Sequence, residues 1–501
     1  MTAALGNDPF SLDPSDTARL GEAFRAAGFS EEGVNAALGI KAISSLKDLS
    51  GDAALRRTAE PSPLNALIRL FIIGSSAAKP VVEPALGGVP TARWIAGGVL
   101  KEGEGMLFAA FKVTPLKGLL IAFDRSWPGQ GVEASDHVMG PSDSARLLST
   151  LLLPPDGGSV LDVGTGCGYL AFLAARQASR VVATDLNPRA AGFVAFNAAL
   201  NGIGNVEART GSVFDPVQGE TFDLIISNPP FVISPEDRLT YANGGMKADG
   251  FCRRMAGEAA AYLKEGGHFQ MLCNWIQTGD EDWTLRLAGW FAASGCDAWA
   301  LRSSTTDPLA YAENWLDLGR HDREHRAERL RAWLEYYREE NIGSIGSGTV
   351  TMRKRAGTDH WFRGFDGPPR LAGPAGGDIR ARMRSLDFLA RRASDDESLL
   401  RAVLRISPAA RMTQECAPSP EGWALEQAQV RLIEGLAYKE EIDNWFAELL
   451  VACDGSRTLK QAMARAASAL GLDADAIPAE TPSVVRQLVD EGFLVPTVTP
   501  H

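Results

Sequence analysis

Apolar positions follow a helical spacing over the first part of this chain of 501 residues. Leu20 and Phe24 lie four residues apart, and Gly28 ends this run. A second apolar run begins at Pro63, with Ser62 in the place of a capping residue. We therefore expect a helical N-terminal domain at 1–92.

The pattern then changes to short apolar runs separated by turns that contain glycine and lysine. The first of these runs is Trp94-Ile-Ala, and the others lie at 106–113 and 119–123. Runs of this length between turn residues are typical of strands. We expect a small antiparallel β element at 93–130.

Strand-like apolar runs alternate with helical patterns after residue 159. The seven runs lie at 160–163, 180–184, 206–210, 222–227, 267–275, 296–303 and 349–355. This alternation predicts a doubly wound, Rossmann-like α/β sheet of seven mostly parallel strands, in a domain at 131–367. The domain contains a helical insertion at 308–346, whose charged helix over 321–340 has the apolar stripe Leu330, Trp333, Leu334 and Tyr337.

The last part of the chain follows a linker rich in proline and glycine at 368–377. Over 378–501 we expect mainly helices and a terminal Gly-Phe-Leu-Val strand, an order typical of a winged-helix-like module. The pattern at 423–442 is compatible with either strands or a helix.

Charge limits the classes of partner. The net charge of −12 argues against a surface devoted as a whole to nucleic acid. Residues 301–392 nevertheless contain 17 Lys and Arg against 13 Asp and Glu. This local surplus fits either a solvated helical face or a basic patch that faces a substrate.

The cysteines and the longest apolar runs limit the cellular setting. Six cysteines are scattered without a Cys-x-x-Cys pair, which indicates neither a disulfide framework nor a zinc site and fits a reducing cytoplasm. The N-terminal sequence does not resemble a signal peptide, and the apolar runs are shorter than the roughly 18 residues that a membrane span needs. We expect a cytoplasmic protein with no membrane partner; the sequence does not indicate its oligomeric state.

The first stretch that indicates chemistry runs from Ser159 to Leu170. Its strand leads into glycines at 164, 166 and 168, where bare backbone lets a ligand come close. Asp185 follows Gly164 by 21 residues, at a position suited to ribose hydroxyls. These features fit any nucleoside cofactor, including a dinucleotide. Asp162 favours S-adenosylmethionine, because a carboxylate there can receive an ammonium group that NAD lacks.

The second stretch is Asn228-Pro-Pro-Phe231, directly after a predicted strand. Two prolines fix the backbone, so that the Asn228 side chain and the Pro229 carbonyl offer two hydrogen-bond acceptors close together. A planar amino group has two N–H donors for such a pair, and accepting both orients its lone pair toward an electrophile. Phe231 can stack on the planar group. A methyl sulfonium is the matching electrophile, and its transfer requires no metal.

Together the two stretches resemble class I S-adenosylmethionine-dependent methyltransferases of the amino-methylating group, which methylate adenine N6, guanine N2 or protein glutamine. Residues 140–148 and 241–253 are similar to segments of HemK-type glutamine methyltransferases, which contain a small methyltransferase domain. Two features depart from the glutamine enzymes: Phe231 stands where tyrosine is usual, and Ser212 stands where an acid near the adenine is usual, so that either Ser212 or Asp215 serves there.

The residues and the resemblance imply one set of site residues. The cofactor-binding residues are Asp162, Gly164, Thr165, Gly166, Gly168, Asp185, Leu186, Ser212, Asp215 and Asn228. The catalytic residues are Asn228, Pro229, Pro230 and Phe231, the substrate-binding residues are Asp143, Gly244 and Gly245, and no metal is expected.

Three functions remain open at this point. The first is methylation of a protein glutamine, supported by the segments at 140–148 and 241–253. The second is methylation of adenine N6 or guanine N2 in RNA or DNA, supported by Phe231, the basic surplus and the C-terminal module. The third is a cofactor-binding scaffold without catalysis.

Overall fold

The computed structural model describes residues 12–125, 136–236, 245–279, 281–318, 323–392, 395–420, 422–473 and 476–497. The contacts divide the chain into two compact units. The first contains residues 1–146, 155–297 and 304–358, and the second contains residues 147–154, 298–303 and 359–501. None of the helices in the described ranges has the length and hydropathy required to cross a membrane.

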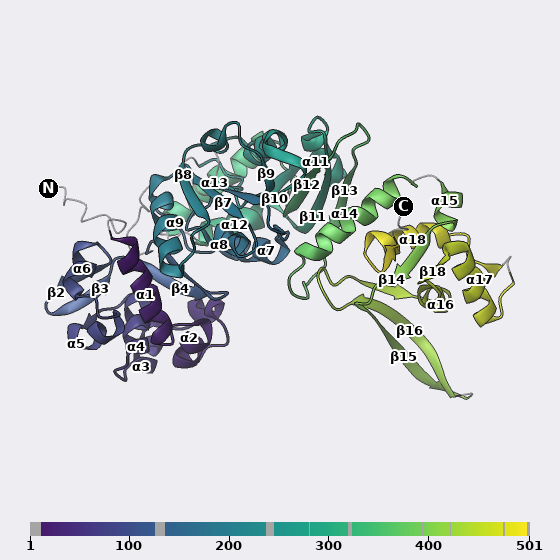
Figure 1. The fold of residues 1–501 in the computed structure, drawn as a ribbon. Helices are drawn as coiled ribbons and strands as arrows, with labels where there is room; N and C mark the ends of the chain where they lie inside the picture. The colour runs from purple at the N-terminus through teal and green to yellow at the C-terminus, as the bar shows by residue number, and fades with distance from the viewer. Residues whose placement is uncertain are drawn as a thin grey trace. The chain divides into compact units, whose positions relative to one another are not determined.

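The first unit begins with the expected group of helices (Figure 1). These are α1 (Pro14–Ala26), α2 (Glu31–Leu38), η1 (Ile43–Asp48), α3 (Gly51–Arg57), α4 (Pro63–Leu67), η2 (Ile68–Ile73), α5 (Lys79–Val82), η3 (Glu83–Ala85) and α6 (Thr91–Ala96). Asp13 caps α1, and Ser62 caps α4 with Pro63 at its first position. The predicted start of α4 is confirmed.

The small β element consists of two antiparallel groups. One is the three-stranded sheet of β1 (Ala77–Ala78), β2 (Leu100–Gly103) and β3 (Met106–Ala109), and the other is the hairpin of β4 (Lys112–Leu116) and β5 (Leu119–Phe123). The prediction of a strand at Trp94 is wrong, because Trp94 lies in α6 and is fully buried there. Three apolar residues in a row do not distinguish a buried helical turn from a strand.

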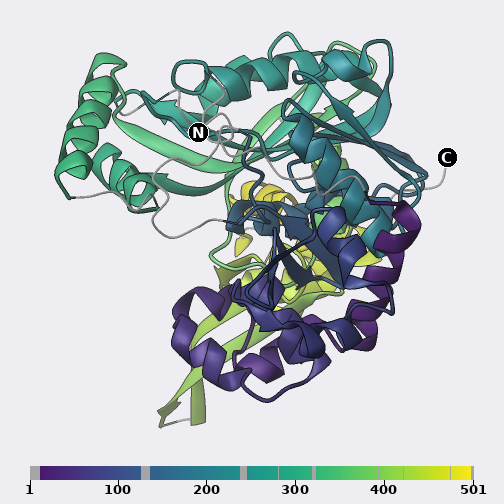
Figure 2. The same ribbon diagram turned by 90° about the vertical axis from the view of Figure 1, so that its left-hand side faces the viewer.

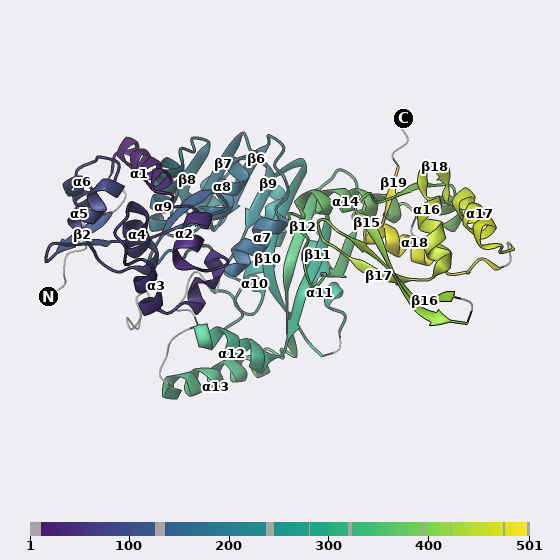
Figure 3. The ribbon, with the colours of Figure 1, turned by 90° about the horizontal axis from the view of Figure 1, so that it is seen from below.

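The central sheet has eight strands in the order β13-β11-β12-β10-β9-β6-β7-β8, most of which are seen side by side in Figure 3. The strands are β6 (Ser159–Val163), β7 (Arg180–Asp185), β8 (Val206–Thr210), β9 (Phe222–Ser227), β10 (Leu263–Gln277), β11 (Cys296–Thr306), β12 (Ser344–Lys354) and β13 (Phe362–Asp366). Helix α7 (Asp143–Leu151) precedes these strands, and α8 (Tyr169–Ala175), α9 (Pro188–Asn201), α10 (Gly250–Ala259) and α11 (Trp283–Phe291) lie between them, with short turns η4 (Asp215–Val217) and η5 (Ala260–Tyr262). All seven predicted strands are present.

The predicted number of strands is wrong, because β13 is an eighth strand. It pairs in parallel with β11 at the edge of the sheet. Its sequence, Phe362-Arg-Gly-Phe-Asp366, has two aromatic residues among charged and small ones and is only partly buried. An edge strand with one solvated face lacks the continuous apolar run that identifies a central strand.

The order of the strands reverses beside β6. The chain passes from β6 outward to β7 and β8 and then returns to β9 on the other side of β6. Val163 at the end of β6 is in register with both Thr184 and Ser227. The residues that follow these three strand ends therefore meet at one edge of the sheet, where open α/β sheets bind ligands. We call it the carboxyl edge.

The insertion forms two helices, α12 (Pro308–Leu318) and α13 (Arg323–Glu339), which lie side by side (Figure 2). The predicted charged helix and its apolar stripe are confirmed: Trp333 and Tyr337 are buried, and Leu330 and Leu334 are partly buried against them. Tyr311 of α12 belongs to the same cluster.

The second unit mixes helices with two small sheets. Its elements are α14 (Gly376–Ala390), α15 (Asp396–Leu400), β14 (Val403–Ile406), β15 (Ala410–Ser419), β16 (Gly422–Leu432), β17 (Lys439–Ile442), α16 (Asn444–Ala452), β18 (Asp454–Thr458), α17 (Leu459–Leu470), α18 (Thr481–Asp490) and β19 (Leu494–Pro496). The sheets have the orders β18-β14-β19 and β15-β16-β17. The pattern at 423–442 was compatible with strands or a helix, and the structure has the strands β16 and β17 there. Strands β15 and β16 form a long hairpin (Figure 1).

Candidate active site

Three glycines with left-handed backbone follow β6. Gly164, Gly166 and Gly168 have φ values of 72°, 54° and 85°, which glycine adopts without steric cost. A Cβ at Gly168 would approach the Phe172 ring to 2.6 Å, whereas a Cβ at Gly164 or Gly166 would meet nothing within 4 Å. Gly168 thus permits tight packing of α8, while Gly164 and Gly166 present bare backbone to open space.

Asp162 lies at the base of this loop and is only 1% exposed. Its Oδ2 accepts hydrogen bonds from the Thr165 hydroxyl at 2.6 Å and from the Ala171 N–H at 3.1 Å. Its Oδ1 is shielded from solvent and has no hydrogen-bond partner among the described residues. Burial, with a smaller contribution from the negative charge of Asp185, raises the pKa of Asp162 to about 7. One carboxylate oxygen therefore shapes the loop, and the other faces no protein donor.

Replacement of this carboxyl gives a prediction about stability. The raised pKa of about 7 means that folded Asp162 keeps its proton between about pH 4 and pH 7, where the unfolded chain has lost it. The contribution of Asp162 to the free energy of unfolding therefore decreases as the pH rises through this window, by up to about 4 kcal/mol. We expect Asp162→Asn, which cannot ionise, to remove this decrease. Urea unfolding at pH 5 and pH 8 checks it, and parallel pH profiles of the two proteins would contradict the buried titration.

Asp185 ends β7 and contacts the glycine loop. Its Oδ2 accepts the Gly166 N–H at 2.8 Å, and its Oδ1 accepts the Asn187 N–H at 2.9 Å. Burial raises the pKa of Asp185, and these backbone hydrogen bonds oppose the rise. Leu186 follows directly and is 64% exposed. The carboxylate therefore connects two strand ends, and an apolar side chain stands in solvent beside it.

The two candidate adenine residues lie in the turn that follows β8. The Gly211 N–H donates to the Asp185 carbonyl at 2.9 Å, which joins this turn to the end of β7. Ser212 is half-buried, and Asp215 is exposed at the start of η4. Both residues belong to the carboxyl edge, and their roles stay predictions.

Asn228 follows β9 at the same edge. Its Nδ2 donates to the Ser144 hydroxyl at 3.3 Å, and the Ser144 hydroxyl also shares a hydrogen bond of 2.7 Å with Ser142. Ser142 in turn caps α7 by accepting the Ala145 N–H at 3.1 Å. The Oδ1 of Asn228 is shielded from solvent and has no partner in the part of the chain that the structure describes. The α7 N-terminus thus holds the amide with its acceptor oxygen unused.

The other residues predicted to bind the acceptor differ in how far they are buried. Pro229 is buried, Pro230 and Phe231 are half-buried, and the Phe231 ring meets Trp315 of α12 nearly edge-on at 6.1 Å between centroids. Asp143 is exposed at the first position of α7. Gly245 is exposed with a φ of 67°, whereas Gly244 lies outside the described residues.

Models of three protein families match parts of this chain. A family model described as methyltransferase small domain matches residues 139–282. Two other models, described as domains of unknown function, match residues 26–110 (DUF7059) and 381–496 (DUF7782). A release factor glutamine methyltransferase of Xylella fastidiosa strain 9a5c is 34% identical over 148 residues, which are 27% of this chain and 54% of that protein. A Methanocaldococcus jannaschii protein with the provisional name protein N5-glutamine methyltransferase is 31% identical over 162 residues, 30% of this chain and 81% of that protein.

The chain belongs to the methyltransferase small domain family. It spans between about half and two thirds of the Xylella relatives, with 54% and 66% of their length. A methyltransferase structure from Pyrococcus furiosus is 18% identical and covers 47% of this chain and 90% of that chain, but its TM-score of 0.28 is too low to support an inference.

One residue that the sequence did not suggest supports the glycine loop of this methyltransferase small domain. Asn197 of α9 is fully buried. Its Nδ2 donates to the carbonyls of Cys167 and Ala122, each at 2.9 Å, and its Oδ1 accepts the Ala122 N–H at 2.8 Å. The signal available in the sequence was an asparagine in the middle of an alanine-rich helix. It joins the glycine loop to β5, which precedes the family match.

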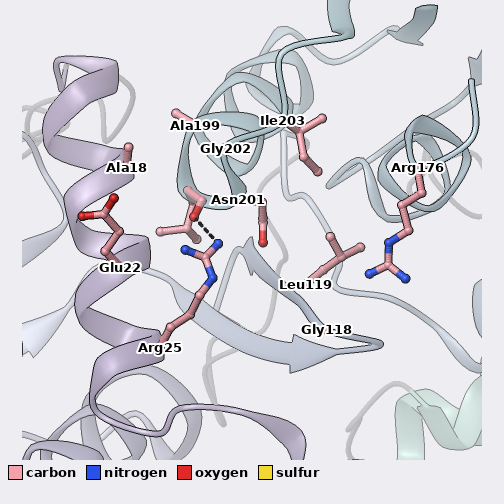
Figure 4. A pocket seen from close by; sticks show the side chains of 11 residues that line it. Ala18, Glu22, Arg25, Gly118, Leu119, Arg176, Ala199, Asn201, Gly202 and Ile203 are labelled. Atoms are coloured by element: carbon pink, nitrogen blue, oxygen red, sulfur yellow. Dashed lines mark hydrogen bonds between the residues drawn. The ribbon is translucent and has the colours of Figure 1, made fainter. Parts of the chain in front are cut away.

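A pocket of about 420 Å³ lies apart from the predicted site residues of the methyltransferase small domain (Figure 4). Residues of α1, the β4–β5 turn and the end of α9 line it. Arg25 of α1 donates to the Leu200 carbonyl at 3.1 Å beside it. Because α9 begins at the carboxyl edge and ends here, the pocket lies at the opposite edge of the sheet.

Proposed function

We propose that this protein transfers a methyl group from S-adenosylmethionine to a planar amino nitrogen, and that its acceptor is the side-chain amide of a protein glutamine. The observation that carries the proposal is the parallel register of β6 and β9, in which Val163 pairs with Ser227. This register puts the glycine loop beside Asn228. The relatives named as glutamine methyltransferases support the choice of acceptor.

The groups at the carboxyl edge fit S-adenosylmethionine. The open space beside Gly164 and Gly166 leaves room for a ligand, and the free Oδ1 of Asp162 is an acceptor for its ammonium group. Asp185 would bind the ribose hydroxyls, and Ser212 or Asp215 would bind the adenine. When bound, the cofactor supplies a methyl group on a sulfonium, an electrophile that requires no metal.

The chain's own residues then orient the acceptor. The unused Oδ1 of Asn228 and the Pro229 carbonyl accept the two N–H groups of the amide. Both contacts direct the nitrogen lone pair toward the glycine loop and favour the positive charge that develops on the nitrogen. Phe231 packs on the planar amide. The hydrogen bond from Asn228 to Ser144 keeps the acceptor oxygen in its orientation.

Methylation of adenine N6 or guanine N2 in RNA or DNA is the second candidate. Phe231 favours it, and so does a winged-helix-like interpretation of the second unit, in which α16, α17 and α18 share one core with the sheet β18-β14-β19. The basic surplus of 301–392 supports it less. Four of those cations are ion-paired within the chain: Arg302 with Asp366, Arg329 with Glu236, and Arg353 and Arg355 with Asp297.

Transfer of label identifies the acceptor. The protein is incubated with S-adenosylmethionine that carries a radioactive methyl group and with cell extract, and the products are treated with protease or with nuclease. We expect label that protease releases and nuclease does not. Acid hydrolysis of that fraction should yield labelled methylamine, because an N-methyl amide hydrolyses to a carboxylic acid and methylamine.

The other outcomes each exclude the glutamine proposal. Label that nuclease releases indicates the nucleobase candidate. Labelled protein that yields no methylamine indicates another protein nitrogen or oxygen. Absence of label from every fraction, with cofactor binding intact in calorimetry, indicates a cofactor-binding scaffold.

A further inference from the structure

The helical insertion contacts the acceptor segment, residues 229–236, at three successive positions. Phe231 meets Trp315 of α12. Ile233 lies between Tyr311 of α12 and Tyr337 of α13. Glu236 binds α13 through two side chains. The segment that would hold the acceptor therefore contacts the insertion between Phe231 and Glu236.

The contacts at Ile233 are the most specific of the three. Its N–H donates to the Tyr311 hydroxyl at 3.2 Å, and its carbonyl accepts from the Tyr337 hydroxyl at 2.9 Å. Two side chains thus satisfy both backbone groups of one buried residue, as a neighbouring strand would. The Tyr311 hydroxyl also accepts from Nδ2 of Asn274 in β10 at 2.6 Å. This bond ties the acceptor segment to the central sheet.

The contacts at Glu236 fix the far end of the segment. Arg329 binds both carboxylate oxygens at 2.7 Å, and Trp333 Nε1 donates to Oε1 at 2.8 Å. A bidentate arginine restrains orientation as well as distance. Asn228 is held by Ser144 at the other end, and the two prolines between limit the backbone. The geometry of the acceptor segment therefore depends on the insertion.

We propose that α12 and α13 act as the positioning element for the acceptor amide, with Tyr311 and Tyr337 as its positioning residues and Trp315 as the wall that orients Phe231. This inference rests on the methyl transfer proposed above. Burial raises the pKa values of both tyrosines, so at neutral pH the hydroxyls stay protonated and keep their two hydrogen bonds to Ile233, which we call the clamp. The acceptor that the enzyme selects is then determined partly by residues 80 to 106 positions beyond the Asn-Pro-Pro-Phe motif.

Removal of single hydroxyl groups tests the inference in the full-length protein. Tyr311→Phe and Tyr337→Phe each keep the ring and lose the contact with Ile233. We expect each to lower kcat by about ten- to a hundredfold and to raise KM for the acceptor, because small misplacements of a reacting group have effects of this size. The affinity for S-adenosylmethionine should not change, since the glycine loop does not contact the insertion in the hydrogen bonds described.

Tyr438→Phe is the matched control. The Tyr438 hydroxyl also donates to a backbone carbonyl, that of Asp366 in the second unit, at 2.9 Å. We expect its kcat and both KM values to equal those of the unmodified protein. Unchanged kcat and acceptor KM in Tyr311→Phe and Tyr337→Phe would overturn the positioning role.

Amide hydrogen exchange tests the clamp without any turnover. The Ile233 N–H should exchange faster in Tyr311→Phe, together with its neighbours in 229–236, and should not do so in Tyr438→Phe. Unchanged protection would refute the clamp even if methyl transfer is confirmed. Faster exchange in a protein that labels no acceptor would leave the clamp intact and refute the proposed function instead.

Discussion

Asn228→Ala should lower kcat for methyl transfer by about two to three orders of magnitude, the usual effect of removing one preorganised group that stabilises developing charge. The physical reason is the loss of the Oδ1 acceptor, which no group of the described chain occupies. The affinity for S-adenosylmethionine should be largely kept, because the glycine loop and Asp185 are untouched. Transfer of radioactive label measures the first quantity and calorimetry measures the second.

Two further variants make this result specific. Ser144→Ala keeps the Asn228 oxygen and removes the 3.3 Å bond that orients the amide, so we expect an intermediate loss of kcat. Asn205→Ala is the matched control, because Asn205 binds the carbonyls of Ala175 and Ala178 away from the carboxyl edge. Its kcat should be normal. Full turnover by Asn228→Ala would refute the proposed mechanism.

Asp185→Ala should weaken the binding of S-adenosylmethionine about 10- to 100-fold, because hydrogen bonds to a charged group contribute roughly 1.5–3 kcal/mol. Two effects combine in this variant. The proposed acceptors for the ribose hydroxyls are lost, and the Gly166 and Asn187 N–H groups lose their partner. Titration calorimetry of the cofactor measures the change.

Two control variants test whether the loss of cofactor affinity comes from the charge of Asp185 and from its place at the carboxyl edge. Asp185→Asn keeps one acceptor oxygen, so its affinity for S-adenosylmethionine should lie between those of the unmodified protein and Asp185→Ala. Asp223→Ala removes a carboxylate that accepts the Ser159 N–H at 2.7 Å at the other end of the sheet, and its cofactor affinity should be normal. Equal affinities of Asp185→Ala and the unmodified protein would exclude the ribose role.

Local patterns were sufficient to predict the strands and the carboxyl edge. The strands that lead into the site were predicted from short stretches rich in apolar residues, and Gly164, Asp185 and Asn228 each follow the end of one such stretch. The rule that parallel strands end at the same edge then brings these residues together without further information. The helix cap at Ser62 was predictable for the same reason, since the capping residue lies next to the helix that it stabilises.

Contacts between distant segments could not be predicted in this way. Tyr311 is 78 residues from Ile233, and Ser144 is 84 residues from Asn228. Tyr311 and Tyr337 had no motif to mark them, and an apolar stripe on a charged helix indicates only that one face is buried. The strand predicted at Trp94 was wrong and strand β13 was missed for a related reason. Tertiary packing, and not the local pattern, decides the structure of such short segments.

The bonds of Asn197 have a practical consequence for anyone who wishes to prepare the catalytic part of the chain alone. The partners of Asn197 and Asn201 include both backbone groups of Ala122 and of Leu120. A truncated protein that begins at residue 131, where the apolar pattern suggests a boundary, would lack them and would expose the asparagine that supports the carbonyl of Cys167. The smallest useful fragment therefore has to begin before β4, so that the hairpin at 112–123 is retained.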